Sequence, residues 1–236
     1  MGKKTTSSII DVTNINEKIY DYIKKNISNQ HFPSGYKLNI RQLSETLGVS
    51  YTPIKDALFR LAGEGLIEIT SRTGTYVKSI TETDIQEILQ IRIILETTVI
   101  EEIARKINDE QLQALNDLYQ KSVSIVVNPN DCESYKIFMD YDSRFHISFF
   151  EVMGNKRLLN IYQTLNAHMQ IVRFRLFNHA LGKLPTTDEE HRMILEALYE
   201  HNAAKAKQAA VKHLTRLKEL CGTIKLDPGN QDARSK

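Results

Sequence analysis

Four polar side chains interrupt the apolar stripes of predicted helices in the second half of the chain. Asp142 and His146 lie one helical turn apart among phenylalanines, and His191 and His213 lie among aliphatic residues on two later helices. Left unpaired in a core, each polar group would cost on the order of 1–3 kcal/mol. A cation bound by all four would remove this cost at once, whereas a hydrogen bond within the core is the alternative for each residue alone.

The chemistry of these donors favours a metal ion. Three imidazoles and one carboxylate suit zinc, nickel or another first-row divalent ion, and we expect zinc or nickel. Four protein ligands leave open positions on a six-coordinate ion, where a small organic acid could bind through a carboxylate. Arg92 and Arg173 fall near the inward faces of their helices and could clamp such an acid. An ion pair on the helix surface is the alternative for each arginine.

Six helices are predicted to position these side chains. Apolar residues at helical spacing predict them over residues 84–106, 109–126, 132–153, 156–180, 187–201 and 203–223. No strand pattern follows Val77, so we predict an all-α bundle of about six helices over residues 81–224. Residues 225–236 are predicted to form a disordered tail.

A different pattern, two short helices joined by a tight turn, occupies residues 39–62. Asn39 can cap the first helix, with Gln42 placed to complete a capping box. Gly48 supplies the tight backbone that ends this helix, and Ser50 is expected to cap the next one. A second helix that begins with exposed polar residues is typical of a helix-turn-helix, whose recognition helix enters the major groove of DNA.

The residues around this pair complete a DNA-binding unit. Residues 66–70 and 75–78 are strand-like and flank a basic, glycine-containing tip, which predicts a hairpin wing beside the recognition helix. A helix over residues 16–28 would close the core, so residues 13–80 are predicted to form a winged helix-turn-helix of three helices plus a small β-hairpin. Residues 1–12 are predicted to be disordered. The candidate DNA-binding residues are Arg41, Ser50, Tyr51, Thr52, Lys55, Arg72 and Gly74.

This N-terminal part resembles the winged-helix domain of the GntR family of bacterial transcription regulators. The resemblance rests on the runs 33–38, 43–45, 47–58, 64–67 and 74–77. The family usually has arginine where this chain has Tyr51 and Lys55. Lys55 keeps the charge but lacks the fork that reads guanine, while Tyr51 can reach a phosphate or a thymine methyl. The resemblance therefore implies DNA binding, but it does not imply a shared operator sequence.

The helical part resembles the FCD domain, the effector-binding domain in the FadR branch of these regulators. The matching segments are 91–96, 142–146, 154–159, 190–194 and 213–214. In many such domains one aspartate and three histidines bind a divalent metal. Those positions fall on Asp142, His146, His191 and His213, all of which are present. The resemblance also implies a homodimer in which effector binding changes the spacing of the two DNA-binding domains.

Composition and charge agree with this division. The chain has 236 residues, of which 41% are hydrophobic and 25% charged, and no apolar run approaches the roughly 18 residues of a membrane span. Residues 1–80 contain 11 Lys and Arg against 7 Asp and Glu, whereas the remainder contains 20 against 22. Two distant cysteines make a disulfide framework improbable. We therefore expect a cytoplasmic protein whose N-terminal end carries the charge for nucleic acid.

The sequence as a whole predicts a mainly α, ligand-responsive transcription regulator that binds operator DNA, and not an enzyme. One alternative is a metal-sensing regulator, in which the ion itself is the signal. The other is a metallohydrolase that uses the same aspartate and three histidines. Against the hydrolase, no further carboxylate is recognised in the sequence as a general base, and the winged domain would have no role.

Overall fold

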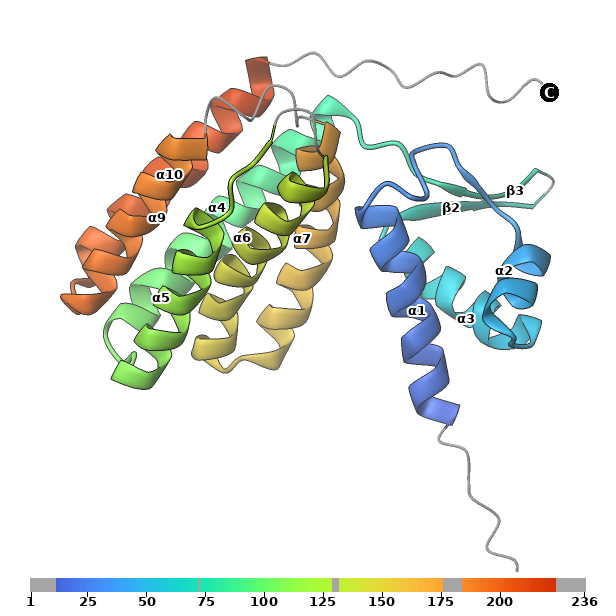
Figure 1. Cartoon of the computed structure of the whole chain (residues 1–236), viewed down its shortest axis with the longest axis horizontal. Coiled ribbons are helices and arrows are strands. Elements are labelled where there is room, and N and C mark those ends of the chain that lie inside the picture. Colours follow the sequence, from blue (N-terminus) through green and yellow to red (C-terminus); the bar gives the residue numbers. More distant parts are fainter. Residues whose placement is uncertain (1–11, 72, 129–131, 176–183, 224–236) are drawn as a thin grey trace, which may run out of the picture. The chain divides into compact units, whose positions relative to one another are not determined.

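The chain divides between Lys78 and Ser79 into two compact units (Figure 1). A computed structural model describes residues 12–71, 73–128, 132–175 and 184–223. Within these residues it contains nine helices and one small sheet, as the mainly α prediction requires. The segments predicted to be disordered lie outside the described residues, except for Val12, which begins the first helix.

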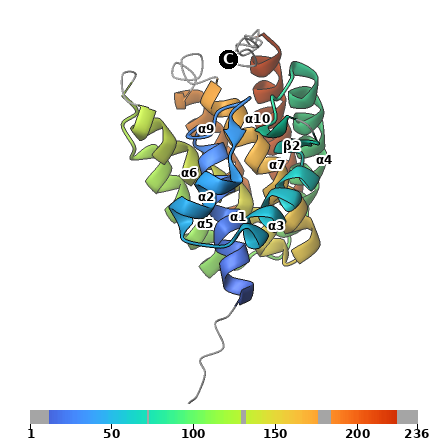
Figure 2. The ribbon, with the colours of Figure 1, turned by 90° about the vertical axis from the view of Figure 1, so that its right-hand side faces the viewer.

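The first unit is a winged helix-turn-helix (Figure 2). Its elements are α1 (Val12–Ser28), β1 (Lys37–Leu38), α2 (Ile40–Leu47), α3 (Tyr51–Gly63), β2 (Ile67–Thr70) and β3 (Gly74–Val77). The antiparallel sheet has the order β1-β3-β2, so the predicted hairpin is confirmed. Strand β1 was not predicted, because its two residues are too few to show an alternating pattern. Helix α1 begins earlier than the predicted Asn16.

The turn between α2 and α3 follows the prediction with two corrections. The first is that the Gln42 side chain forms no return bond to the Asn39 backbone, so the predicted capping box is incomplete. Gly48 adopts the left-handed conformation (φ 65°, ψ 31°) that a side chain would disfavour, and the Asn39 side chain accepts hydrogen bonds from the backbone N–H groups of Arg41 and Gln42. Ser50 occupies the N-cap position of α3, but the predicted cap is wrong: its side chain makes no cap hydrogen bond. Its hydroxyl therefore remains at the exposed start of the recognition helix.

The faces of α3 are arranged as its sequence predicts. Its apolar residues Ile54, Ala57, Leu58 and Leu61 are buried, and α3 packs against α1. Tyr51, Thr52 and Lys55 are exposed at the start of the helix. The recognition helix is therefore held by its inner face and presents a polar, partly basic outer face.

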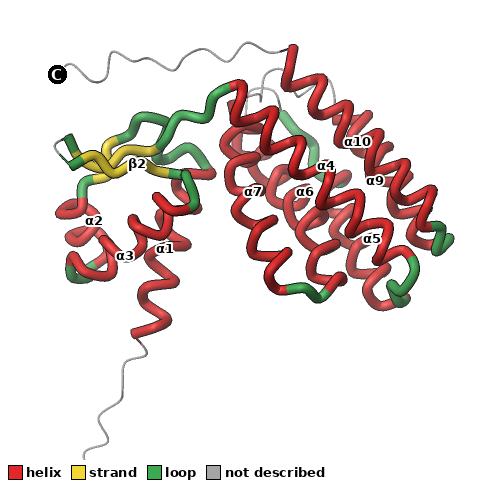
Figure 3. Tube along the Cα trace, turned by 180° about the vertical axis from the view of Figure 1, so that it is seen from behind, coloured by secondary structure: helices red, strands yellow, loops and turns green. Residues whose placement is uncertain are grey.

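The second unit is an all-α bundle (Figure 3). Its six helices within the described residues are α4 (Glu82–Ala104), α5 (Asp109–Val123), α6 (Cys132–Met153), α7 (Lys156–Arg175), α9 (Leu184–Tyr199) and α10 (Ala203–Thr223). Helix α4 packs mainly against α10, and α6 contacts α4, α5 and α7. None of the helices in the described part of the chain combines the length and apolarity that a bilayer crossing needs.

Several helix ends of the second unit differ from the predicted boundaries. Helix α4 runs from Glu82 to Ala104 rather than over 84–106, and α9 ends at Tyr199 rather than His201. Helix α9 starts at Leu184 rather than Thr187, because Pro185 falls in its first turn, where a proline costs no hydrogen bond. Helix α5 ends at Val123, before the predicted Val126. The predicted capping box of Thr81 and Asp84 at the start of α4 is confirmed. Despite these shifts, Asp142, His146, His191 and His213 lie on the helices that were predicted to carry them.

Candidate metal centre

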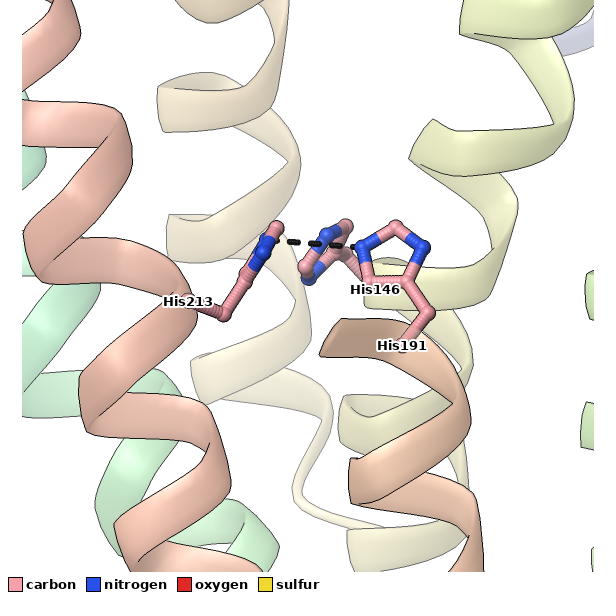
Figure 4. A group of neighbouring side chains, drawn as sticks. All are labelled: His146, His191 and His213. Carbon is pink, nitrogen blue, oxygen red and sulfur yellow. Dashed lines mark hydrogen bonds between the residues drawn. The ribbon is translucent and has the colours of Figure 1, made fainter. Parts of the chain in front are cut away.

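Three imidazoles from three helices converge in the interior of the bundle (Figure 4). Helix α6 supplies His146, α9 supplies His191 and α10 supplies His213, and all three residues are buried. One ring nitrogen of each lies within 4.8 Å of those of the other two. The Nε2 atoms of His191 and His213 are 3.4 Å apart. Helical spacing alone placed these residues inside, and the packing of α6, α9 and α10 brings them together.

Phenylalanine side chains form one wall of this cluster. The Phe145 ring lies 4.8 Å from the His191 ring and 4.9 Å from that of Phe149. Burial lowers the pKa of His191 well below its usual range, and the neighbouring His213 lowers it further. Burial also lowers the pKa of His213, against the opposing effect of its hydrogen bond to Glu190. The environment of His191 and His213 therefore favours their neutral form, the form that binds metal ions.

Asp142 borders the cluster from α6. Its Oδ1 lies 3.7 Å from His191 Nε2, and its Oδ2 is ion-paired with Arg173 Nη1. Burial alone would raise the pKa of Asp142, but the Arg173 guanidinium holds it well below its usual range. The carboxylate is therefore ionised. One of its oxygens contacts Arg173, and the other lies nearest His191.

Two carboxylates that the sequence analysis did not select complete the cluster. Glu96 Oε2 lies 2.7 Å from His146 Nδ1, and Glu190 Oε2 lies 2.9 Å from His213 Nδ1. A signal for Glu96 was present, because it occupies the apolar stripe of α4 in the same way that Asp142 does on α6. Glu190 had no such signal beyond its place next to His191.

The donor set fits a divalent metal ion. His146 Nε2 is buried and has no hydrogen-bond partner among the described residues. An unpaired buried nitrogen costs about 1–3 kcal/mol, and a shared cation would remove that cost. The bonds at Nδ1 of His146 and His213 resemble the carboxylate–histidine contacts that orient zinc ligands. Asp140 lies on the same helix as Asp142 but does not belong to this donor set, because it pairs with Arg144 on the exposed side of α6.

Both candidate effector-binding arginines point inward, so the surface ion pair is wrong for each. The Arg92 side chain is 0% exposed and donates to Glu96 Oε1 (2.6 Å) and to the Tyr162 hydroxyl (3.0 Å). Its Nη1 is buried and has no partner in the described part of the chain. The Arg173 side chain is 11% exposed and contacts Asp142. The two arginines thus approach the cluster through different carboxylates.

The candidate DNA-binding residues lie on the first unit. Arg41 Nε pairs with Glu45 Oε1 at 2.9 Å, with its side chain 79% exposed, and Tyr51 is 50% exposed. Gly74 has a φ of 122°, a backbone conformation that other residues rarely adopt, so the tip of the wing favours glycine at this position. Arg72 lies outside the described residues.

Comparison with known families agrees with this architecture. Residues 15–77 match the gntR family of bacterial regulatory proteins, and residues 87–216, more than half of the chain, match the FCD domain. The chain belongs to the GntR family. It is a DNA-binding transcription regulator that carries an FCD domain, as the sequence predicted, and some FCD domains bind a metal. The metal-sensing and metallohydrolase alternatives find no support in these matches.

Several known proteins are similar to this GntR regulator. An uncharacterized HTH-type transcriptional regulator of Bacillus subtilis, YdhC, is 29% identical over 83% of this chain and 86% of its own. The HTH-type transcriptional repressor RspR of Escherichia coli is 24% identical over 89% and 90%. The solved structure of E. coli McbR/YncC covers 89% of this chain and 97% of its own, with a TM-score of 0.76 and 18% identity, so this similarity concerns the fold.

Proposed function

We propose that the FCD domain of this regulator binds one divalent metal ion, zinc or nickel, through Asp142, His146, His191 and His213. The observation that carries the proposal is the buried Nε2 of His146, which lacks a partner and belongs to a cluster of three imidazole nitrogens. Asp142 supplies the anionic fourth donor from the side of His191. The bound metal would supply a Lewis-acidic anchor for an oxygen of the effector.

The proposed effector is a small organic acid. Arg92 supports this class of ligand, because its buried Nη1 has no acceptor and a carboxylate oxygen would satisfy it. Arg173 is the second candidate, since its guanidinium already contacts a carboxylate, that of Asp142. In the proposed complex the two arginines orient the acid while its carboxylate occupies an open position of the metal.

The proposed output is a change in operator binding by a homodimer in the cytoplasm. Two winged domains would contact two half-sites of double-stranded DNA, each through the start of α3 and the wing. Effector binding in the helical domain would change the separation of the two recognition helices and hence the affinity for the operator. The exposed Ser50, Tyr51, Thr52 and Lys55 support this placement of the DNA.

The test of the metal proposal is elemental analysis of protein purified without chelators, combined with mass spectrometry of any retained small molecule. We expect about one zinc or nickel ion per chain. A value near zero, after attempted loading with zinc, nickel and manganese, would reject the metal site. Retention of a carboxylic acid by the wild-type protein, and its loss from an Arg92→Met variant, would support the effector class.

The DNA contact is tested by Lys55→Ala. Lys55 is exposed at the start of the recognition helix, so we expect operator affinity to fall by about 1–3 kcal/mol, roughly five- to hundredfold, without loss of the fold. Gel-shift titration at fixed salt measures the change. Lys156→Ala, at an exposed position at the start of α7, is the control. Unchanged affinity in both Lys55→Ala and Arg41→Ala would reject this docking surface.

Tyr51 is expected to influence which operator is chosen. Side chains that face base edges carry sequence specificity, whereas phosphate contacts carry most of the affinity. Tyr51→Arg should therefore change the preferred sequence more than it changes the affinity for the best site. Selection from randomised operator DNA, carried out with both proteins, measures this preference. Identical selected sequences would show that Tyr51 does not face the bases.

A further inference from the structure

Two glutamates each join an arginine to one of the clustered histidines. Glu96 accepts from Arg92 Nε through Oε1 (2.6 Å), and its Oε2 faces His146 Nδ1 (2.7 Å). Glu190 accepts from Arg216 Nε through Oε1 (2.6 Å), and its Oε2 faces His213 Nδ1 (2.9 Å). The same arrangement thus occurs twice, on different helices and around different imidazoles.

We propose that Glu96 and Glu190 are positioning residues that fix the ring tautomers of His146 and His213. Each would hold its imidazole with the proton on Nδ1, so that the lone pair on Nε2 points toward the metal position. This inference rests on the proposed metal site, and it adds a role for two residues that are not themselves ligands. In the metal-free protein, Nε2 of His146 and Nε2 of His213 would then already present their lone pairs to the metal position.

The tautomer follows from the hydrogen-bonding capacity of the groups. A carboxylate paired with a guanidinium only accepts hydrogen bonds, so the imidazole nitrogen that faces it must donate. A neutral imidazole has one N–H, and the other nitrogen then carries a lone pair. With the proton on Nε2 instead, the lone pair of Nδ1 would face a carboxylate oxygen, and the buried Nε2–H of His146 would have no acceptor. The contacts therefore select a single tautomer at both residues.

The contact between His191 and His213 agrees with this assignment. Their Nε2 atoms lie 3.4 Å apart, so one of the two must carry a proton in the metal-free protein. Glu190 places the His213 proton on Nδ1, which leaves His213 Nε2 as the acceptor and His191 Nε2 as the donor. Asp142 Oδ1, 3.7 Å from His191 Nε2, favours the same proton. Only His191 would have to change its protonation pattern when metal binds.

Glu190→Gln is the variant that tests the proposal. The Arg216 side chain is 24% exposed and can reach water after the change, whereas the guanidinium of Arg92 is fully buried and would lose its partner in Glu96→Gln. A glutamine can either accept from or donate to Nδ1, so it no longer selects one tautomer. We expect zinc affinity to fall about 10- to 100-fold. Glu189→Gln, on the exposed side of α9 beside Arg192, is the matched control and should leave the affinity unchanged.

Two measurements on the full-length protein separate this inference from the proposed function. Competition with a zinc chelator gives the affinity, and long-range ¹H–¹⁵N NMR of the metal-free protein reports the tautomer of each histidine. We expect Nδ1–H at His146 and His213 in the wild type, and a mixed state at His213 in Glu190→Gln. A wild type that binds no metal would reject the metal site, while the tautomers would still test the role of the glutamates. Nε2–H at His213 in the wild type, or equal zinc affinities of Glu190→Gln and Glu189→Gln, would overturn the inference.

Discussion

Replacing His213 by alanine is expected to lower the melting temperature of the metal-loaded protein by about 10 °C, on a scale of about 2–4 °C per kcal/mol for this size. A metal present at 100 times its dissociation constant stabilises the fold by about 2.7 kcal/mol, and that contribution would be lost. Removal of the ring also leaves Glu190 Oε2 without its hydrogen-bond partner, at a further cost of about 1–3 kcal/mol, while Oε1 keeps Arg216. Differential scanning calorimetry with and without chelator measures both terms.

The control for this variant is His168→Ala. His168 lies on α7, is partly buried and bonds to the Thr164 carbonyl. Its replacement therefore removes an imidazole from the same bundle but leaves the three clustered histidines in place. Chelator should lower the melting temperature of the wild type and of His168→Ala, and it should have little effect on His213→Ala. Equal sensitivity of all three proteins to chelator would mean that the ion is bound elsewhere or not at all.

Replacing Arg92 by alanine is expected to lower the free energy of unfolding by about 3–5 kcal/mol, the usual cost of breaking a buried ion pair. The guanidinium is fully buried and donates to both Glu96 and Tyr162. Its removal leaves the Glu96 carboxylate as a buried charge whose remaining partners are His146 and the Tyr162 hydroxyl. Urea denaturation followed by circular dichroism measures the change.

Arg105→Ala provides the comparison. Arg105 follows α4 and pairs with Glu101 and Glu102 at the surface, where an ion pair contributes roughly 0–1 kcal/mol. The two variants remove the same side chain from the same part of the chain but differ in burial. Similar losses of stability in both would contradict the structural role assigned to Arg92.

The helical periodicity of the sequence was sufficient to place the imidazoles. Asp142 and His146 share a face with phenylalanines, and that face is buried as predicted. The same reasoning placed His191 and His213 inside. The spacing predicted that the four residues point into one core, and the family resemblance supported a shared site, because periodicity alone does not say which helix faces meet. The structure adds that His146, His191 and His213 approach one another closely.

Contacts between distant helices could not be obtained in this way. The bond between Glu96 and His146 joins residues 50 positions apart, and that between Arg173 and Asp142 spans 31. Both depend on how helices pack, which no local pattern encodes. Sequence reasoning thus identified the residues of the site better than their partners.

The buried ion pairs around the imidazoles have a consequence for electroneutrality. Three guanidinium groups directly contact three carboxylates there: Arg92, Arg173 and Arg216 with Glu96, Asp142 and Glu190. With neutral imidazoles these formal charges cancel, so a divalent cation would add two positive charges that these three carboxylates do not offset. Desolvating such an excess costs several kcal/mol per ion. A dianionic acid would cancel this excess charge. The metal ion and the acid would therefore each raise the affinity of the protein for the other by the same factor.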